Sequence, residues 1–283
     1  MYKIINWYTK HFPFPRRGLK FFLLFLKSMG LYHREFCKRL HNGSLFLTRP
    51  SEHIQQQLFW YGYYEKEAIL TWEQMVQADA VVLDIGANTG YYSVIAARKA
   101  SHIYAFEPGS INREKLARNK KLNKLANITV LPYAVSDKQG KTELYIAGDD
   151  NTGMNSLEQP GNFSGRKEVV SEISIDNWAA ENRIPFISLI KIDVEGSEMQ
   201  ALKGMQRIIE EQKPVIFIEV IGQLLIRSGY STTEVYDFLT AKGYYAYEII
   251  SPLQLKRISI AKESDSIVFV HTSRTFPAAI GLE

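Results

Sequence analysis

The chain has 283 residues, 46% hydrophobic and 23% charged, which suits one large globular domain with an appendage and excludes collagen-like, coiled-coil and extended disordered proteins. Cys37 is the only cysteine, so an internal disulfide and a cysteine-based zinc site are excluded, and a reducing, cytoplasmic setting is favoured. The net charge is +4, but residues 1–50 carry ten Lys or Arg against the single acid Glu35, so the basicity belongs to the N-terminal arm.

Residues 1–72 form an aromatic-rich extension that we expect to be helical. Within residues 12–30, large apolar side chains lie between basic ones, a pattern that is typical of helices on anionic membrane surfaces. The apolar run is shorter than the ~20 residues that span a bilayer. Two interpretations stay open: peripheral contact with the inner face of a membrane, or helices packed on the core with their lysines in water. A nucleic-acid partner is not expected.

Residues 73–283 are expected to form an α/β domain whose elements alternate along the chain. An apolar run closed by glycines precedes a helix-compatible stretch, which predicts the strand, tight turn and helix that open a βαβ unit. The alternation then repeats, which predicts a parallel sheet covered by helices. The expected elements in this half are strands Ala80–Ile85, His102–Phe106 and Ile128–Val135, and helices Tyr91–Lys99 and Asn112–Asn123.

The stretch Gly148–Lys167 interrupts this alternation with Asn, Gly, Asp and Ser residues. We predict an irregular surface loop there. Because active-site loops close to exclude water, Asn155 and Ser156 are candidates to cover the acceptor, the alternative being a solvated connector.

The second half of the domain continues the pattern and ends with antiparallel strands. The apolar residues between its first two strands have helical spacing. The last two strands, joined by a long loop, should pair antiparallel, which gives a mostly parallel seven-stranded sheet. The expected elements are strands Ser188–Asp193, Pro214–Val220, Tyr244–Ile250 and Ser266–Val270, and helices Ser197–Gln212 and Thr232–Lys242.

The segment VVLDIGANTG, Val81 to Gly90, contains the first strand and its turn, where doubly wound sheets bind ligands. Gly86 and Gly90 permit a sharp turn, but the second glycine of G-x-G-x-x-G is missing, which disfavours a dinucleotide. Asp84 would repel a phosphate and attract the cationic methionyl end of S-adenosylmethionine. Glu107 ends the second strand 23 positions later, where an acid accepts hydrogen bonds from ribose hydroxyls.

Four motifs follow one another in the chain: VVLDIGANTG, AFEP at Ala105–Pro108, ITVLPYAVSD at Ile128–Asp137 and LIKIDVEGSE at Leu189–Glu198. Through them the chain resembles the FkbM-type methyltransferase family over roughly residues 80 to 220. The resemblance implies a Rossmann-like class I fold and methyl transfer from S-adenosylmethionine, usually to a hydroxyl oxygen of sugars, macrolides or other natural products. It also implies a cofactor site made of the turn residues Asp84, Gly86, Asn88 and Gly90, the ribose acid Glu107, the adenine-side wall Ala134 and Val135, and Asp193 beside the methyl donor.

Methyl transfer to a hydroxyl needs a base near the acceptor oxygen, because the hydroxyl is a poor nucleophile until its proton is lost. Asp193, Glu195 and Glu198 form an acidic cluster after the fourth strand, and Asp193 is our first candidate for the base. Acids in a first helical turn also stabilise the helix, which is the alternative role for Glu195 or Glu198. A divalent metal on the three carboxylates is an alternative that we do not predict, because their spacing is not a diagnostic metal loop. Glu219 ends the fifth strand and could reach the substrate or bond nearby backbone.

Two other functions compete with methyl transfer. A non-catalytic module that binds S-adenosylmethionine would keep Asp84 and Glu107 but would not need the acidic cluster. An NAD-dependent oxidoreductase would share the ribose acid, but it should have the missing glycine and a Tyr-x-x-x-Lys pair after the fourth strand. The sequence therefore favours a methyltransferase with a small-molecule or glycan acceptor.

Overall fold

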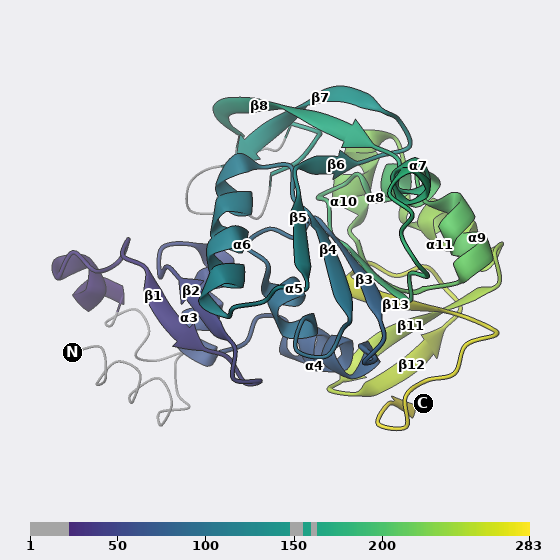
Figure 1. Cartoon of the computed structure of the whole chain (residues 1–283), viewed down its shortest axis with the longest axis horizontal. Helices are drawn as coiled ribbons and strands as arrows, with labels where there is room; N and C mark the ends of the chain where they lie inside the picture. The colour runs from purple at the N-terminus through teal and green to yellow at the C-terminus, as the bar shows by residue number, and fades with distance from the viewer. Residues whose placement is uncertain (1–22, 148–154, 160–162) are drawn as a thin grey trace.

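The structure is a computed structural model that describes residues 23–147, 155–159 and 163–283. A nine-stranded sheet runs through its centre, with helices on both faces (Figure 1). In spatial order the strands are β14 (Gly281–Leu282), β12 (Gln254–Ile258), β11 (Tyr244–Ser251), β13 (Ser264–His271), β10 (Val215–Val220), β9 (Leu189–Ile192), β3 (Val81–Ile85), β4 (His102–Phe106) and β5 (Ile128–Leu131).

The sheet has a parallel centre and an antiparallel C-terminal edge. Strands β5, β4, β3, β9 and β10 are parallel, and β13 lies antiparallel between β10 and β11. The predicted α/β class with a mostly parallel sheet is thereby confirmed. Strands β12 and β14 add to the seven that we predicted. The expected long loop turns back at Leu253, with φ of +65°, so that β12 pairs with β11, and residues Gly281–Leu282 after β13 pair with β12.

The central strands are buried on both faces, which is why they read as continuous apolar runs in the sequence. Val82 and Phe217 belong to one hydrophobic core, and Leu83 and Ile216 belong to the core on the other face. The first core includes residues of α4 (Lys66–Met75), α5 (Tyr91–Ala96) and α6 (Ser110–Leu122), and the second includes residues of α7 (Ile175–Glu181), α8 (Glu198–Lys203), α9 (Gln206–Gln212), α10 (Gly222–Leu225) and α11 (Thr232–Thr240).

The predicted helix Ser197–Gln212 is two helices, α8 and α9, which meet at Gly204. A Cβ atom on Gly204 would lie 2.0 Å from the carbonyl oxygen of Ser136, so any larger residue would force the two segments apart. The break therefore comes from a tertiary contact that helical periodicity does not record.

A second sheet interrupts the regular alternation after β5. Pro132 ends β5 because it has no N–H to donate, so the predicted strand Ile128–Val135 is divided between the two sheets. Figure 1 shows the smaller sheet beyond the end of β5. Its strands, in spatial order, are β6 (Tyr133–Val135), β8 (Phe163–Ile173) and β7 (Gly140–Ala147). The predicted loop Gly148–Lys167 ends too late, because its last residues, from Phe163 on, belong to β8. Residues 148–154 and 160–162 of this loop lie outside the described residues.

The N-terminal extension is a mixed structure and not purely helical as we expected. A hairpin of β1 (Phe36–Arg39) and β2 (Leu45–Thr48) precedes α3 (His53–Tyr61). Two asparagine side chains, from α6 and the residue after it, accept hydrogen bonds from backbone N–H groups of β2. The N–H of Leu45 donates to Asn123 Oδ1 at 2.7 Å, and the N–H of Leu47 donates to Asn119 Oδ1 at 2.9 Å. The hairpin is thus bonded directly to a helix of the sheet domain.

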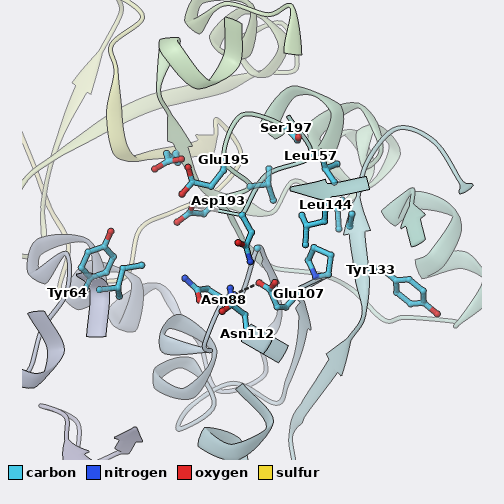
Figure 2. A pocket seen from close by; sticks show the side chains of 18 residues that line it. Tyr64, Asn88, Glu107, Asn112, Tyr133, Leu144, Leu157, Asp193, Glu195 and Ser197 are labelled. Atoms are coloured by element: carbon cyan, nitrogen blue, oxygen red, sulfur yellow. Dashed lines mark hydrogen bonds between the residues drawn. The ribbon is translucent and has the colours of Figure 1, made fainter. Parts of the chain in front are cut away.

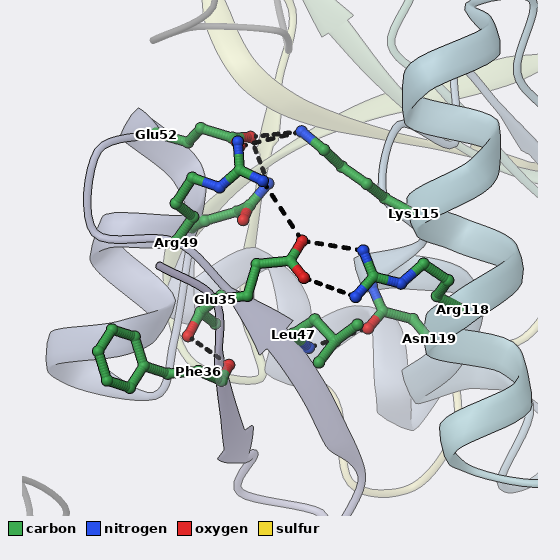
Figure 3. Close-up of polar contacts among 10 residues, drawn as sticks. Glu35, Phe36, Leu47, Arg49, Glu52, Lys115, Arg118 and Asn119 are labelled. Atoms are coloured by element: carbon green, nitrogen blue, oxygen red, sulfur yellow. Dashed lines mark hydrogen bonds and ion pairs between the residues drawn. The ribbon is translucent and has the colours of Figure 1, made fainter. Parts of the chain in front are cut away.

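Charged side chains also tie the extension to α6 (Figure 3). Arg118 donates to both carboxylate oxygens of Glu35, and Lys115 Nζ lies 2.9 Å from Glu52 Oε2. Arg49 lies between the two acids and pairs with both. Because the Glu52 side chain is only 4% exposed, its ion pair with Lys115 is screened less than a surface pair. This network fixes the residue that precedes α3 against α6.

No helix in residues 23–147, 155–159 and 163–283 is long and apolar enough to cross a membrane. Most of the arm for which we predicted peripheral membrane contact, residues 12–30, lies outside the described residues. Membrane contact therefore stays a prediction.

Substitution of Trp72 tests whether the extension, residues 1–72, folds separately from the domain, residues 73–283. Its side chain is fully buried and packs edge-on against Tyr92 and Phe217. We expect Trp72→Ala to lower the free energy of unfolding by about 3–5 kcal/mol in a single denaturant transition. The exposed Ile226→Ala serves as the control and should change it by less than about 0.5 kcal/mol. Two separate transitions, or an unchanged midpoint for Trp72→Ala, would show that the extension is independent.

Candidate active site

A cleft of about 760 Å³, including space open to solvent, lies at the carboxyl ends of β3, β4, β9 and β10. The strand order reverses there, because β4 and β5 lie on one side of β3 and β9 and β10 on the other. Doubly wound sheets bind their ligands at such a switch point. Figure 2 shows Asn88 and Glu107 on one side of this cleft and Asp193 and Glu195 above them.

The turn after β3 brings two strand ends into backbone contact. Gly86 has a φ of +79°, and a Cβ atom there would lie 1.8 Å from the carbonyl oxygen of Asp193, so glycine is required on both counts. Asn88 also has a positive φ, +50°, and lines the cleft. Gly90 lies behind the lining, where a Cβ atom would meet Leu116 at 2.7 Å. Of these three predicted cofactor residues, Gly86 and Asn88 reach the cleft surface.

Glu107 lines the cleft with both carboxylate oxygens fixed by backbone donors. The N–H of Gly109 donates to Oε1 and the N–H of Asn88 donates to Oε2, each at 2.8 Å. Burial raises the pKa of Glu107 to about 7 in spite of these two hydrogen bonds. Each oxygen keeps a lone pair, so the side chain can still accept hydrogen bonds from two neighbouring hydroxyls of a ligand.

Asp84 lies beneath the turn and is not among the cleft-lining residues. It is 2% exposed, and Ser93 Oγ of α5 donates a short hydrogen bond to its Oδ2. Burial raises the pKa of Asp84 to about 6, although the bond from Ser93 opposes the shift. The position fits a carboxylate that anchors α5 to β3, and any attraction of a cationic ligand would act through the intervening turn.

The far wall of the cleft comes from the smaller sheet. Ala134 and Val135 of β6 line the cleft together with Leu144 of β7 and Leu157. Their side chains make an apolar surface beside Glu107. The predicted adenine-side residues thus lie together, but on a strand that belongs to the second sheet.

The expected active-site loop contributes to the cleft in its described part, residues 155–159. Asn155 lines the cleft, and its Oδ1 accepts a hydrogen bond of 3.0 Å from the N–H of Ala147. Ser156 Oγ donates to the carbonyl oxygen of Glu195 at 2.7 Å. The first bond connects the segment to the end of β7, and the second connects it to the acidic turn after β9.

Three acids face one another at the other end of the cleft. Oxygen atoms of Asp193, Glu195 and Glu219 lie within 4.8 Å of one another. Burial, and then the charges of Asp193 and Glu198, raise the pKa of Glu195 to about 8. Burial, followed by the charges of Asp193 and Glu195, also raises the pKa of Glu219 well above its usual value. Such a group of carboxyls is suited to accept protons or to bind cations.

Glu198 does not join this group, although we predicted a catalytic cluster of Asp193, Glu195 and Glu198. Its side chain is 1% exposed, and its Oε1 accepts hydrogen bonds from the N–H groups of Val194 and Gly196, at 3.2 and 3.1 Å. Glu198 therefore holds the turn that carries Glu195, as an acid in a first helical turn does. Glu219 of β10 takes the third place in the cleft.

Lys191 is a buried cation beneath the acidic end, and our sequence analysis missed it because it lies inside an apolar strand. Its Nζ donates to Asp193 Oδ2 at 3.0 Å and lies 5.0 Å from the centre of the Tyr92 ring. Burial lowers the pKa of Lys191, but the carboxylates of Asp193, Glu65 and Glu219 raise it overall above its usual value. Lys191 therefore keeps its charge in a buried position.

Two residues of the extension complete the cleft and were also missed. Ile54 of α3 and Tyr64, which precedes α4, line it. Figure 2 shows Tyr64 across the cleft from Asp193 and Glu195. The residues around Ile54 and Tyr64 form an ordinary aromatic-rich sequence, so no motif there predicts a role in a cleft.

Lys191→Met should lower the free energy of unfolding by about 3–5 kcal/mol near pH 8, because it leaves several buried carboxyls without their cation. Protonation relieves the repulsion among acids of raised pKa, so the loss should be smaller near pH 5.5, below the pKa of about 8 of Glu195. Urea denaturation at both pH values measures this. Lys138→Met, at an exposed position, is the control. Equal losses at the two pH values would contradict the assigned role.

Comparison with known families and proteins matches this chain to methyltransferases. The methyltransferase FkbM domain matches residues 84–245. Hexuronic acid methyltransferase AglP of Haloferax volcanii is 27% identical over 154 residues, which cover 54% of this chain and 61% of AglP. The 2-O-methyltransferase NoeI of Sinorhizobium fredii is 24% identical over 177 residues, 57% of this chain and 71% of NoeI. The match therefore leaves more than a third of AglP uncovered.

Among solved structures, the methyltransferase FkbM from Methylobacillus flagellatus aligns with a TM-score of 0.46 and 16% identity, over 77% of this chain and 52% of that one. The domain match alone covers more than half of the present chain and contains Glu107, Asp193, Glu195 and Glu219. The chain belongs to the FkbM methyltransferase domain family.

Proposed function

We propose that this protein transfers a methyl group from S-adenosylmethionine to a hydroxyl oxygen of a sugar or another small molecule. The observation that carries the proposal is one continuous cleft with a ribose-type acid, Glu107, at one end and the acidic group of Asp193 and Glu195 at the other. A donor and an acceptor can therefore meet inside it. The names of AglP and NoeI, a hexuronic acid methyltransferase and a 2-O-methyltransferase, support a sugar hydroxyl as the acceptor class.

The residues at the Glu107 end of the cleft, the donor half, fit S-adenosylmethionine. Glu107 would accept hydrogen bonds from the ribose hydroxyls, and Ala134, Val135 and Leu144 would cover the adenine. The Oδ1 atom of Asn88 is buried without a hydrogen-bond partner among the described residues, so it is free to accept a donor of the ligand. When bound, the cofactor supplies an electrophilic methyl group on a cationic sulfur, and Asp193 would stabilise that charge.

Glu195 is a better candidate for the base than Asp193, which was our first choice. Asp193 already accepts a hydrogen bond from the Lys191 ammonium, so one of its oxygens is occupied. Glu195 has a pKa of about 8, which is closer to a working pH. We propose that Glu195 takes the hydroxyl proton while Asp193 faces the donor, and we no longer propose a catalytic role for Glu198.

The competing functions are less well supported. In a dinucleotide site, a glycine at the position of Asn88 would let the backbone approach the pyrophosphate, and the Asn88 side chain stands in that place. A passive binding module would not need the raised pKa of Glu195 and Glu219. We do not propose a metal, because the Lys191 ammonium already acts as the cationic partner of Asp193. A cytoplasmic location, with membrane contact through residues 12–30, stays part of the proposal.

Glu107→Gln tests the donor half. The amide can accept hydrogen bonds through one oxygen only, so we expect S-adenosylmethionine to bind at least about tenfold more weakly in calorimetric titrations. Wild-type affinity should also fall as the pH drops below about 7, because the protonated Glu107 has lost one acceptor site. The exposed Glu211→Gln is the matched control. No binding to the wild type, or tighter binding of NAD, would refute the cofactor assignment.

Substitution of Glu195 tests the acceptor half, the end of the cleft that contains Asp193, Glu195 and Glu219. A base must be deprotonated to act, so kcat/KM should rise with pH and level off above about 8. Glu195→Gln should lower kcat by about 10²–10⁴-fold and remove this rise. Methyl transfer is measured on the fastest glycoside of a methyl hexoside panel, and carbon-13 NMR of the glutamate carboxyls should show a resonance that titrates near pH 8 and is absent from the variant. If the variant keeps the resonance and the pH profile, Glu195 is not the base.

A further inference from the structure

The acceptor half of the cleft carries acidic groups without a lining cation. Among the described residues that line the cleft, Glu107, Asp193, Glu195 and Glu219 are acidic and none is Lys, Arg or His. Asp193, Glu195 and Glu219 lie at the same end, with oxygens within 4.8 Å of one another. A carboxylate or phosphate on the acceptor would be repelled there and would find no charged partner.

Lys191 neutralises only part of this charge. Its ammonium is hydrogen-bonded to Asp193 and lies behind the lining. The charges of Lys191 and Arg227 also act on Glu195, but burial and the neighbouring acids still raise the pKa of that carboxyl. One oxygen of Glu219, Oε2, is buried without a hydrogen-bond partner among the described residues. An unpaired buried carboxylate oxygen costs free energy, which a hydrogen-bond donor from a ligand would recover.

An aromatic ring lies opposite the acids. Tyr64 lines the cleft, and its hydroxyl faces the carboxylates of Asp193 and Glu195 (Figure 2). Burial, and then the charges of Glu65, Asp193 and Glu219, raise the pKa of its phenol, so the side chain lies near these acids. Carboxylates on one side and an aromatic ring on the other are the surroundings that proteins use to bind alkylammonium groups.

We propose, on the basis of the function proposed above, that the acceptor carries a protonated amino group near the hydroxyl that is methylated, as an amino sugar does. The ammonium would donate to the unpaired oxygen of Glu219 and lie between this acid and Tyr64. Glu195 would then remain available to the hydroxyl. A sugar with a carboxylate at this acidic end of the cleft would be repelled.

The experiment compares methyl glucoside with two ligands that each differ from it in one group: methyl glucosaminide, which has an ammonium at carbon 2, and methyl glucuronide, which has a carboxylate at carbon 6. Their dissociation constants are measured by NMR titration of the full-length protein, with and without S-adenosylhomocysteine. We expect the glucosaminide to bind at least about tenfold more tightly than the glucoside, and the glucuronide to bind most weakly. Equal affinities, tighter binding of the glucuronide, or no binding of the glucosaminide overturns the proposal. Failure of S-adenosylhomocysteine to bind would instead refute the proposed function, while the titration without it still tests the amine site.

Glu219→Gln should reduce the ratio of glucoside to glucosaminide dissociation constants to nearly one, because a bound ammonium favours the ionised form of Glu219 and an amide cannot ionise. Glu195→Gln is the second variant if the first does not fold, and it should also lower the ratio, because it removes a second carboxyl that can ionise beside the ammonium. Glu181→Gln, at the exposed end of α7, should keep the wild-type ratio. A preference for the amine that persists in both cleft variants overturns the assignment to these acids.

Discussion

The ammonium group of Lys191 is the interaction on which the acidic end of the cleft depends. It lies inside β9, and the charges of Asp193, Glu65 and Glu219 act on it, as it acts on Asp84 of β3. These carboxyls come from β3, from the residue before α4, from the end of β9 and from β10. Without a cation among them, four acids would share a buried region of like charge, which would destabilise the fold at neutral pH. Lys191 therefore stabilises the meeting of acids from several elements at one end of the sheet.

Different neighbours give these acids different properties. Asp193 is paired with the ammonium, Glu107 is held by two backbone N–H groups, and Glu198 is committed to the turn. Burial next to other acids raises the pKa of Glu195, although the charge of Arg227 opposes the shift. In the proposed function, the acid beside Lys191 would face the cationic donor, and the acid with a raised pKa would accept the proton. The division of work thus follows from hydrogen bonding and burial at each position.

The donor half could be predicted from the sequence because its residues lie in short contiguous motifs at strand ends. Gly86 and Glu107 each follow an apolar strand, and the parallel sheet then brings them together. The acceptor half depends on contacts between distant segments, which no local pattern encodes. Lys191 looks like a solvent-facing residue of a strand, and only the register of β3, β9 and β10 shows that it is enclosed. The exchange of Glu198 for Glu219 has the same origin: Glu198 begins α8 and Glu219 lies near the end of β10, but only Glu219 lines the cleft.

The N-terminal extension gives the site a feature that the family domain does not contain. The matched residues 84–245 include all four cleft acids, but Ile54 and Tyr64 lie outside them. The extension reaches the cleft because β2 is hydrogen-bonded to Asn119 and Asn123 and because Lys115 holds Glu52, next to the start of α3. Substitutions in the extension can therefore reshape the acceptor wall while the turn of Gly86 and the Glu107 site remain intact. In the proposed function, Ile54 and Tyr64 would therefore add to the acceptor side of a cleft whose acids all come from the matched domain.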